Sequence, residues 1–326
     1  MPALVVRDLT TEFLTEAGPV RALDSVGFAI DAGETVALVG ESGSGKSVTA
    51  LSILDLIPHR TGRIVAGSVM LDGTELRRLD ERQMQQLRGK HISMIFQEPM
   101  TSLNPLMAVG DQIGEVLRLH TDLSSRAVEA RVLELLELVQ IPDARQRARD
   151  YPHQFSGGMR QRVVIAIALA CHPKVLIADE PTTALDVTVQ AQILGLIRRL
   201  QRQLGIALLL ITHDLRLVRT FADRVVVMYA GRKVEEAAVS TVLNAPAHPY
   251  TKGLIGSVMD PRTAGKRARL QTIPGMVPSL SAMPSGCAFA PRCSFAEARC
   301  RNSKPTIEFV ADGHVAACHV FARAAQ

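Results

Sequence analysis

The sequence lacks any apolar stretch long enough to cross a lipid bilayer as a helix. Its most apolar run, Val163–Ala170, is far shorter than the roughly 18 residues that a membrane helix requires. The first eight residues also lack the basic segment followed by an apolar one that marks a secretory signal. These absences argue against an integral membrane protein and predict a cytoplasmic location.

A dense run of basic residues is also missing. Lys and Arg are spread along the 326 residues, so the net charge of +5 gives only weak support for nucleic-acid binding and suits a phosphate ligand or an anionic membrane surface. Hydrophobic residues make up 47% of the chain and charged residues 21%, which is ordinary for a globular protein with room for two domains. We expect no nucleic-acid partner.

The most informative pattern is G-x-x-x-x-G-K-S, which directly follows the apolar segment Thr35–Val39. In such a loop the backbone N–H groups point inward at phosphates, the lysine adds a positive charge and the final serine can ligate magnesium. A helix over Val48–Ile57 should then direct its positive end at the anion. The alternative is a chance match in a glycine-containing turn, which the preceding strand and the following helix disfavour. The predicted nucleotide-binding residues are Gly40, Ser42, Gly43, Ser44, Gly45, Lys46, Ser47 and Val48.

Two acidic residues close the apolar segment Val175–Ala178. Because successive side chains of a strand point in different directions, one carboxylate can hold magnesium while its neighbour addresses a water. We assign Asp179 to the metal and Glu180 to the general base that orients the attacking water. The alternative is a strand end with acidic caps ahead of a proline turn.

A second helix start also suits an anion. Ser156, Gly157 and Gly158 precede the apolar stretch Val163–Ala170, and a helix start offers unpaired N–H groups, a hydroxyl and a favourable dipole. Alone, this motif would be a simple helix cap. Two phosphate-seeking helix starts in one chain suggest a nucleotide held between two surfaces.

Short apolar strands alternate with longer amphipathic stretches to about residue 235, which indicates an α/β fold with a mostly parallel sheet covered by helices. The candidate strands are Val36–Val39, Ile92–Phe96, Val175–Ala178, Ala207–Ile211 and Val225–Tyr229. Apolar residues at helical spacing around Val132–Val139 indicate an inserted helical subdomain at about 98–160. The composition then shifts to proline and cysteine, so we predict domains at 1–236 and 237–326.

In order and spacing these segments resemble the ATP-binding cassette (ABC) ATPases. Gly40–Ser47 matches the Walker A motif of that family, Phe155–Gln161 its signature motif and Lys174–Glu180 its Walker B motif. Further matches are Ala184-Leu185-Asp186, the Q-loop residue Gln97 and the switch histidine His213. Alone, Gln97 would be a loop glutamine and His213 a core histidine, but the whole set of motifs in register disfavours both interpretations. The resemblance covers about residues 4–235.

The resemblance implies a P-loop NTPase cassette with an antiparallel β part at its N-terminus, and ATP and Mg²⁺ as its ligands. It also implies a head-to-tail dimer in which Ser156, Gly157 and Gly158 contact the partner's nucleotide and Asp186 communicates across the interface. Gln97 would ligate Mg²⁺ and couple nucleotide state to a membrane partner. His213 would contact the γ-phosphate. Where many cassettes stack adenine on an aromatic residue, this chain has Ala17 or a neighbour, with Phe13 and Val20 as weak alternatives.

The tail is similar to the C-terminal region of oligopeptide and dipeptide importer ATPases, through His248–Thr251, Pro274-Gly275 and Gly286–Cys293. This similarity implies an importer subunit that powers uptake of peptides or a related small solute from the cytoplasmic face of the inner membrane. Its partners would be a second ATPase subunit, identical or distinct, two transmembrane permeases and an extracytoplasmic solute-binding protein. Nickel complexes and oligosaccharides remain alternative cargoes.

Four cysteines lie in this tail with the spacing C-x5-C-x6-C-x17-C: Cys287, Cys293, Cys300 and Cys318. Because a cytoplasmic location disfavours structural disulfides, clustered thiols predict a metal ion or a cluster. Four thiolates suit zinc as well as an iron–sulfur cluster, and the family resemblance favours a 4Fe–4S cluster. The alternative is four unliganded buried cysteines.

Two other functions compete with the importer. A soluble cassette ATPase of DNA repair or translation would usually carry two cassettes or a long coiled-coil insertion, and neither is visible. A redox-regulated ATP-binding module would use the four cysteines as its sensor, with ATP turnover secondary. Intact Glu180 and His213 favour an ATPase.

Overall fold

The computed structural model describes residues 2–16, 18–97, 102–183, 185–257 and 272–321. The chain forms two compact units, and neither is continuous in sequence. The helical unit consists of residues 1–4, 30–34 and 72–210, and the phosphate-loop unit of residues 5–29, 35–71 and 211–326. Each unit is described by itself below.

A sheet organises the phosphate-loop unit, and its strands lie in the order β11-β12-β10-β9-β3. Parallel pairing of β3 with β9 places Val39 opposite Val227 at the end where the phosphate loop leaves the sheet. β10 pairs antiparallel with both β9 and β12, so the C-terminal strands extend this sheet. The strand bounds are β3 (Thr35–Val39), β9 (Arg224–Tyr229), β10 (Arg232–Ala238), β11 (Glu308–Ala311) and β12 (His314–Ala316).

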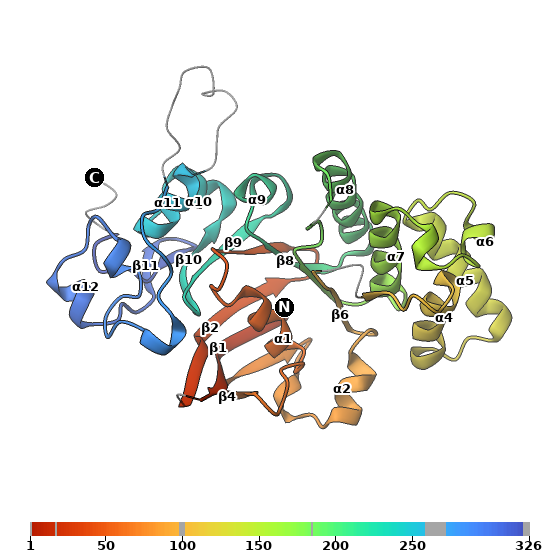
Figure 1. The fold of residues 1–326 in the computed structure, drawn as a ribbon, viewed down its shortest axis with the longest axis horizontal. Coiled ribbons are helices and arrows are strands. Elements are labelled where there is room, and N and C mark those ends of the chain that lie inside the picture. Colours follow the sequence, from red (N-terminus) through yellow and green to blue (C-terminus); the bar gives the residue numbers. More distant parts are fainter. Residues whose placement is uncertain (1, 17, 98–101, 184, 258–271, 322–326) are drawn as a thin grey trace, which may run out of the picture. The chain divides into compact units, whose positions relative to one another are not determined.

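A second sheet has its strands in the order β2-β1-β4, and most of their residues lie in the same unit. Their bounds are β1 (Pro2–Thr15), β2 (Gly18–Asp31) and β4 (Gly62–Leu71). Helix α10 packs against β9 and β10 (Figure 1). The helices of the unit are α1 (Lys46–Ile53), α9 (Leu215–Phe221), α10 (Val239–Asn244), α11 (Pro249–Gly256) and α12 (Ala298–Asn302), with short 3-10 turns at Leu280–Ala282 and Ala290–Arg292.

The helical unit combines three strands of the order β8-β7-β6 with a group of helices. β6 and β7 run parallel, with Ile95 opposite Ala178, so their carboxyl ends meet at one edge. The strands and short elements are β5 (Thr74–Glu75), β6 (Ile92–Ile95), β7 (Val175–Asp179) and β8 (Ala207–Thr212, the last two residues in the other unit), and 3-10 turns at Leu76–Arg78 and Pro152–Gln154. The helices are α2 (Glu81–Leu87), α4 (Val109–His120), α5 (Ser125–Leu138), α6 (Ala144–Arg147), α7 (Gly157–Leu169) and α8 (Val187–Leu204).

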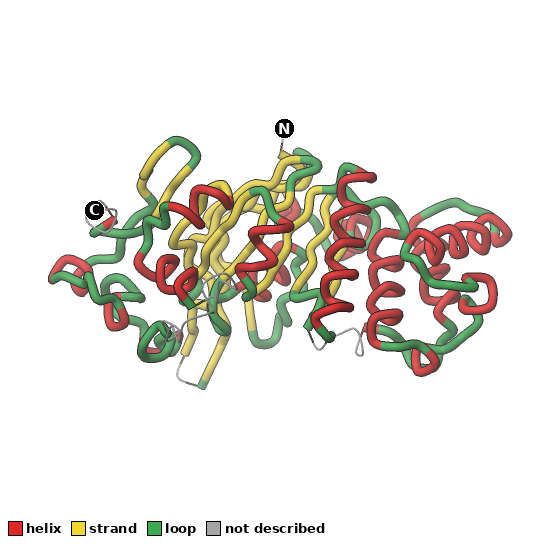
Figure 2. The backbone as a smooth tube through the Cα atoms, turned by 90° about the horizontal axis from the view of Figure 1, so that it is seen from above, coloured by secondary structure: helices red, strands yellow, loops and turns green. Residues whose placement is uncertain are grey.

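The predicted helical insertion is present within this unit. Helices α4 and α5 pack on each other and on α7, and α6 packs on α5 (Figure 1). Residues 109–169 are drawn as helices and connecting loops in Figure 2. In α5 the buried residues recur at helical spacing and form the apolar face of the helix: Val128, Val132, Leu135 and Leu136. The described helices include none with the length and hydropathy of a membrane span.

The sequence predicted the five central strands to within one residue at each end. The helix after the phosphate loop differs from its prediction, because it begins at Lys46 and ends at Ile53 rather than continuing to Ile57. Asp55 has a left-handed φ of 52°, which an α-helix does not accommodate. Only a short helix therefore follows the loop.

Candidate functional site

The phosphate loop connects β3 to α1 within the phosphate-loop unit. A Cβ atom on Gly40 would lie 2.3 Å from the carbonyl oxygen of Met228, so only glycine fits there without movement of the backbone. Gly45 has a φ of 100°, and a Cβ atom on it would lie 2.9 Å from Cδ2 of Leu23. These contacts explain why the sequence has glycine at both ends of the loop.

The polar groups of the loop fit a phosphate ligand. Lys46 begins α1, and its Nζ donates to the carbonyl oxygens of Gly40 at 2.9 Å and Glu41 at 3.1 Å, so the ammonium is folded over the loop. The side chain of Ser44 is fully buried, and its Oγ has no hydrogen-bond partner among the described residues. A cation, a buried hydroxyl and the start of a helix are the groups that cradle a phosphate. Ser47 follows in the first turn of α1.

The two predicted carboxylates lie at the end of β7 in the helical unit. Asp179 is buried, with an exposed fraction of 3%. Glu180 has a φ of 45°, a left-handed conformation that turns the chain sharply out of the strand. The two residues therefore differ in both burial and backbone direction.

Glu180 and Gln97 contact each other after the ends of β7 and β6. Oε2 of Glu180 accepts a hydrogen bond from Nε2 of Gln97 at 3.2 Å and another from Oγ1 of Thr183 at 3.0 Å. Parallel pairing of β6 and β7 explains this meeting, because both strands end at the same edge of the sheet. Sequence reasoning missed Thr183. Its place three residues after Glu180, in a threonine-containing turn, was the available signal.

Two helix starts in the helical unit carry the remaining predicted residues. Ser156 is the N-cap of α7, and its Oγ accepts from the N–H of Met159 at 3.3 Å. Asp186 is the N-cap of α8, and its Oδ1 accepts from the N–H of Val189 at 2.9 Å. Both capping residues are exposed, so each helix start is accessible from solvent.

Space is tight at the second helical position of α7, where a side chain would displace a methyl group of Val189. A Cβ atom on Gly158 would lie 2.7 Å from Cγ1 of Val189. Gly157 is exposed beside it. The anchor of this segment is Phe155, which is buried with an exposed fraction of 3% and lies under the guanidinium of Arg147. The simple cap and the anion site use the same residues, so this geometry is compatible with both.

Comparison with known proteins identifies the cassette. Residues 23–183 match the model of the family described as "ABC transporter", and residues 234–300 match "Oligopeptide/dipeptide transporter, C-terminal region". A putative peptide import ATP-binding protein of Brucella ovis is 53% identical over 97% of this chain and 96% of its own length. A probable peptide ABC transporter ATP-binding protein of Sinorhizobium fredii is 52% identical over 97% of this chain and 94% of its own length. The chain belongs to the ABC transporter ATPases.

Solved structures agree with this assignment. The ATP-binding cassette MJ0796, in a dimeric post-hydrolysis state bound to ADP and Pi, is 29% identical with a TM-score of 0.65, covering 72% of this chain and 98% of its own. CbiO1 of Clostridium perfringens, part of the transporter complex CbiONQ, is 27% identical with a TM-score of 0.64, covering 74% of this chain and 91% of its own. The predicted P-loop cassette fold and ATPase activity are confirmed.

His213, the predicted switch histidine of the ABC ATPase, follows β8 directly and is exposed in the phosphate-loop unit. The next residue, Asp214, is the N-cap of α9 and accepts from the N–H of Arg216 at 2.9 Å. The position of His213 is thereby fixed between a buried strand end and a capped helix. Its contact with a γ-phosphate stays a prediction.

The adenine platform of the ABC ATPase also stays a prediction. Ala17 lies outside the described residues, as does Ala184 of the motif that ends in Asp186. Phe13 is a half-buried residue of β1, and Val20 is a half-buried residue of β2.

The predicted metal site in the ABC ATPase tail is wrong. The described residues contain no group of three or more His, Cys, Asp or Glu side chains that could hold a metal ion, so neither a 4Fe–4S cluster nor zinc fits there. All four tail cysteines, Cys287, Cys293, Cys300 and Cys318, are free thiols. The spacing alone did not distinguish ligands from apolar packing.

The four tail thiols lie in apolar surroundings and not around a metal ion. Cys300 and Cys318 are buried in a small apolar cluster with Ala290 and Val320. Cys293 lies instead against the main core of the phosphate-loop unit. Burial raises the pKa of Cys318 to about 12, and it raises the pKa values of Cys287 and Cys293 as well. Protonated thiols in apolar surroundings behave as small hydrophobic side chains.

Proposed function

We propose that this chain is the ATP-hydrolysing subunit of an ABC importer that powers uptake of peptides or a related small solute. One observation carries the proposal: an ABC cassette and an oligopeptide/dipeptide transporter C-terminal region occur in the same chain. In the structure β10, at the start of the C-terminal region, pairs with β9, and β9 pairs with β3 of the cassette match, so the two regions share a sheet. The relatives named as peptide import proteins support the same function.

The phosphate loop would bind the β- and γ-phosphates of ATP. Lys46, held over the loop by the carbonyl oxygens of Gly40 and Glu41, would donate to phosphate oxygens, and the buried hydroxyl of Ser44 would gain a partner. Oxygen donors of Ser47, Asp179 and Gln97 suit Mg²⁺, which would supply neutralisation of the phosphate charge. The donor types fit this ion.

Glu180 would act as the general base. The oxygen of water attacks the γ-phosphorus, the bond to the oxygen that bridges to ADP breaks, and the proton of the water passes to the carboxylate of Glu180. Hydrogen bonds from Gln97 and Thr183 hold this carboxylate in one orientation. His213 would contact the γ-phosphate and help to position the water.

A head-to-tail dimer would complete each site. The exposed helix start at Ser156, Gly157 and Gly158 would contact the nucleotide of a second cassette, identical or distinct, and Asp186 would communicate across that interface. Support comes from the solvent-accessible capping residues of α7 and α8, and from the dimeric state named for the MJ0796 cassette. Binding of ATP would close the dimer, and loss of phosphate would reopen it.

Two transmembrane permeases would receive this motion at the cytoplasmic face of the inner membrane. Gln97 would couple nucleotide state to them through the helical insertion, and an extracytoplasmic binding protein would deliver the solute. Glu180 meets Gln97 directly, which gives that coupling a physical route.

Reconstitution tests the proposal. The chain is co-expressed with candidate peptide permeases and a second cassette and is placed in lipid vesicles with a peptide-binding protein. We expect ATP hydrolysis to rise severalfold when the binding protein carries a peptide, and not when it is empty. Hydrolysis that responds to DNA or ribosomes and ignores the permeases would instead indicate the soluble repair or translation ATPase.

A further inference from the structure

Glu41 lies in the phosphate loop, and its polar groups bond both to residues of the tail and to residues of the loop itself. Its carboxylate accepts from Nη1 of Arg292 at 2.6 Å and from Nη2 at 3.1 Å, and its N–H donates to Oη of Tyr250 at 2.8 Å. Its carbonyl oxygen accepts from the N–H of Ser44 and from Nζ of Lys46, both at 3.1 Å. Two tail residues, Tyr250 and Arg292, therefore fix Glu41. The carbonyl oxygen of Glu41 in turn accepts from Lys46.

Arg292 is committed to this position by all five of its N–H donors. Besides the two bonds to Glu41, Nε donates to the carbonyl oxygen of Pro274 at 2.8 Å, Nη2 to that of Ile273 at 3.3 Å and Nη1 to Oη of Tyr229 at 3.3 Å. The side chain has an exposed fraction of 6%. Because each N–H of the planar guanidinium donates a hydrogen bond, a lysine in this position would lose some of these bonds.

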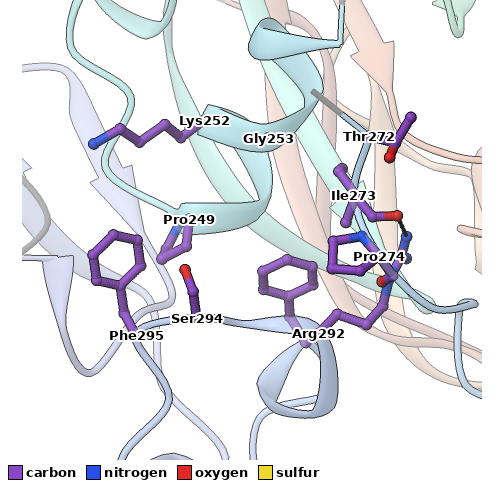
Figure 3. A pocket seen from close by; sticks show the side chains of 10 residues that line it. Pro249, Lys252, Gly253, Thr272, Ile273, Pro274, Arg292, Ser294 and Phe295 are labelled. Carbon is purple, nitrogen blue, oxygen red and sulfur yellow. Dashed lines mark hydrogen bonds between the residues drawn. The ribbon is translucent and has the colours of Figure 1, made fainter. Parts of the chain in front are cut away.

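The same arginine lines a pocket of about 230 Å³ between α11 and the turn that ends at Arg292. Figure 3 shows its side chain reaching along the pocket wall to the backbone at Ile273 and Pro274. The ring of Phe289 lies 5.9 Å from its guanidinium carbon. Two backbone carbonyls and an aromatic ring therefore hold the guanidinium in place beside Glu41.

Tyr250 is held just as firmly. Its ring is fully buried in an aromatic cluster, 4.6 Å from the ring of Tyr229 and 5.4 Å from that of Phe289. Its N–H donates to Nδ1 of His248, which caps α11. Burial raises the pKa of the Tyr250 hydroxyl, so the group stays neutral beside Glu41.

We propose that Tyr250 and Arg292 are positioning residues through which the C-terminal tail sets the shape of the phosphate loop and hence the affinity for ATP. Displacement of Glu41 would move a carbonyl that binds both Ser44 and Lys46, so the cradle would lose its arrangement before ATP arrives. The chemical step depends on Glu180 and should change little. This inference rests on the proposed function, because it concerns the same nucleotide site.

Conservative variants of the full chain test this role. Tyr250→Phe removes only the hydroxyl that accepts from Glu41, and Arg292→Lys removes the two-bonded geometry while it keeps the charge. We expect Tyr250→Phe to raise the Kd and KM for ATP about fivefold and Arg292→Lys about tenfold or more, with kcat within about twofold of wild type. The measurements are equilibrium ATP binding and steady-state phosphate release.

Tyr229→Phe is the graded comparison: it removes one of the five acceptors of Arg292 in the same aromatic cluster and leaves the bonds of Glu41 to Arg292 and Tyr250 in place. It should leave the Kd for ATP within about twofold of wild type. A double-mutant cycle adds Glu41→Gln: the effect of Arg292→Lys should shrink in that background, because the partner carboxylate is already gone. Melting of the nucleotide-free variants, followed by circular dichroism, checks that each one folds.

The outcomes separate the two proposals. A raised Kd with an unchanged kcat and a coupled Glu41→Gln cycle supports the positioning role. An unchanged Kd in Tyr250→Phe and Arg292→Lys overturns it, as does an equal loss in Tyr229→Phe, which would indicate general damage to the tail. A wild-type chain that binds no ATP would overturn the proposed function itself.

Discussion

The substitution Glu180→Gln should remove the proposed general base and keep the hydrogen bonds that hold this side chain. Oε2 of Glu180 accepts from Gln97 at 3.2 Å and from Thr183 at 3.0 Å, and a glutamine can present its amide oxygen to the same two donors. Fold and ATP binding should therefore persist. The amide cannot take a proton from water, so hydrolysis should fall by about 10²–10⁴-fold, the usual contribution of a general base. That loss equals about 3–5 kcal/mol of barrier.

Thr183→Val is the graded control, because valine keeps the shape of threonine and removes one of the two hydrogen bonds to Glu180. A hydrogen bond to an ionised carboxylate is worth about 1.5 kcal/mol or more, so hydrolysis should fall about tenfold or somewhat more. Phosphate release and equilibrium ATP binding are measured for both variants. Hydrolysis by Glu180→Gln within about threefold of wild type would refute the assignment of Glu180 as the base.

Three further predictions concern the loop and the tail. Gly40→Ala places a Cβ atom 2.3 Å from the carbonyl of Met228, so it should lower the free energy of unfolding by about 1–3 kcal/mol and weaken ATP binding, as measured by denaturant titration and calorimetry. Burial lowers the pKa of His248 from 6.5 to about 3, so the folded protein requires a neutral imidazole. The free energy of unfolding should therefore decline as the pH falls from about 6.5 toward 5, and thermal melts of His248→Asn should show a smaller decline. Burial raises the pKa of Cys318 to about 12, so above about pH 9 the free energy of unfolding should fall more steeply with pH for wild type than for Cys318→Ala. Equal pH dependence in the two proteins would count against a buried neutral thiol at this position.

Local patterns were enough to predict the strands and the nucleotide motifs. Each central strand is a short apolar run bounded by polar residues, and Gly40 and Gly45 are positions where contacts or backbone angles admit only glycine. The contact of Gln97 with Glu180 was not predicted, although both residues follow strands that the sequence did predict. Periodicity and backbone restriction act over a few residues, so a sequence displays them directly.

Long-range packing could not be predicted in the same way. The ion pair of Glu41 with Arg292 joins residues 251 positions apart, and no local pattern connects them. The cysteine spacing predicted a cluster, yet Cys300 and Cys318 bury their thiols among apolar side chains, because cysteine serves equally well as a ligand and as a small hydrophobic residue. Helix α1 ended early at a left-handed Asp55 that propensity did not reveal.

The central claim is that residues 40–47 of this ABC ATPase bind ATP. Calorimetric titration of the purified full chain with ATP and Mg²⁺ tests it most directly, with Lys46→Ala as the paired variant. We predict saturable binding by the wild-type chain and a loss of at least about tenfold in affinity for Lys46→Ala. A folded wild-type chain that gives no binding heat and no competition with a labelled nucleotide would contradict the account.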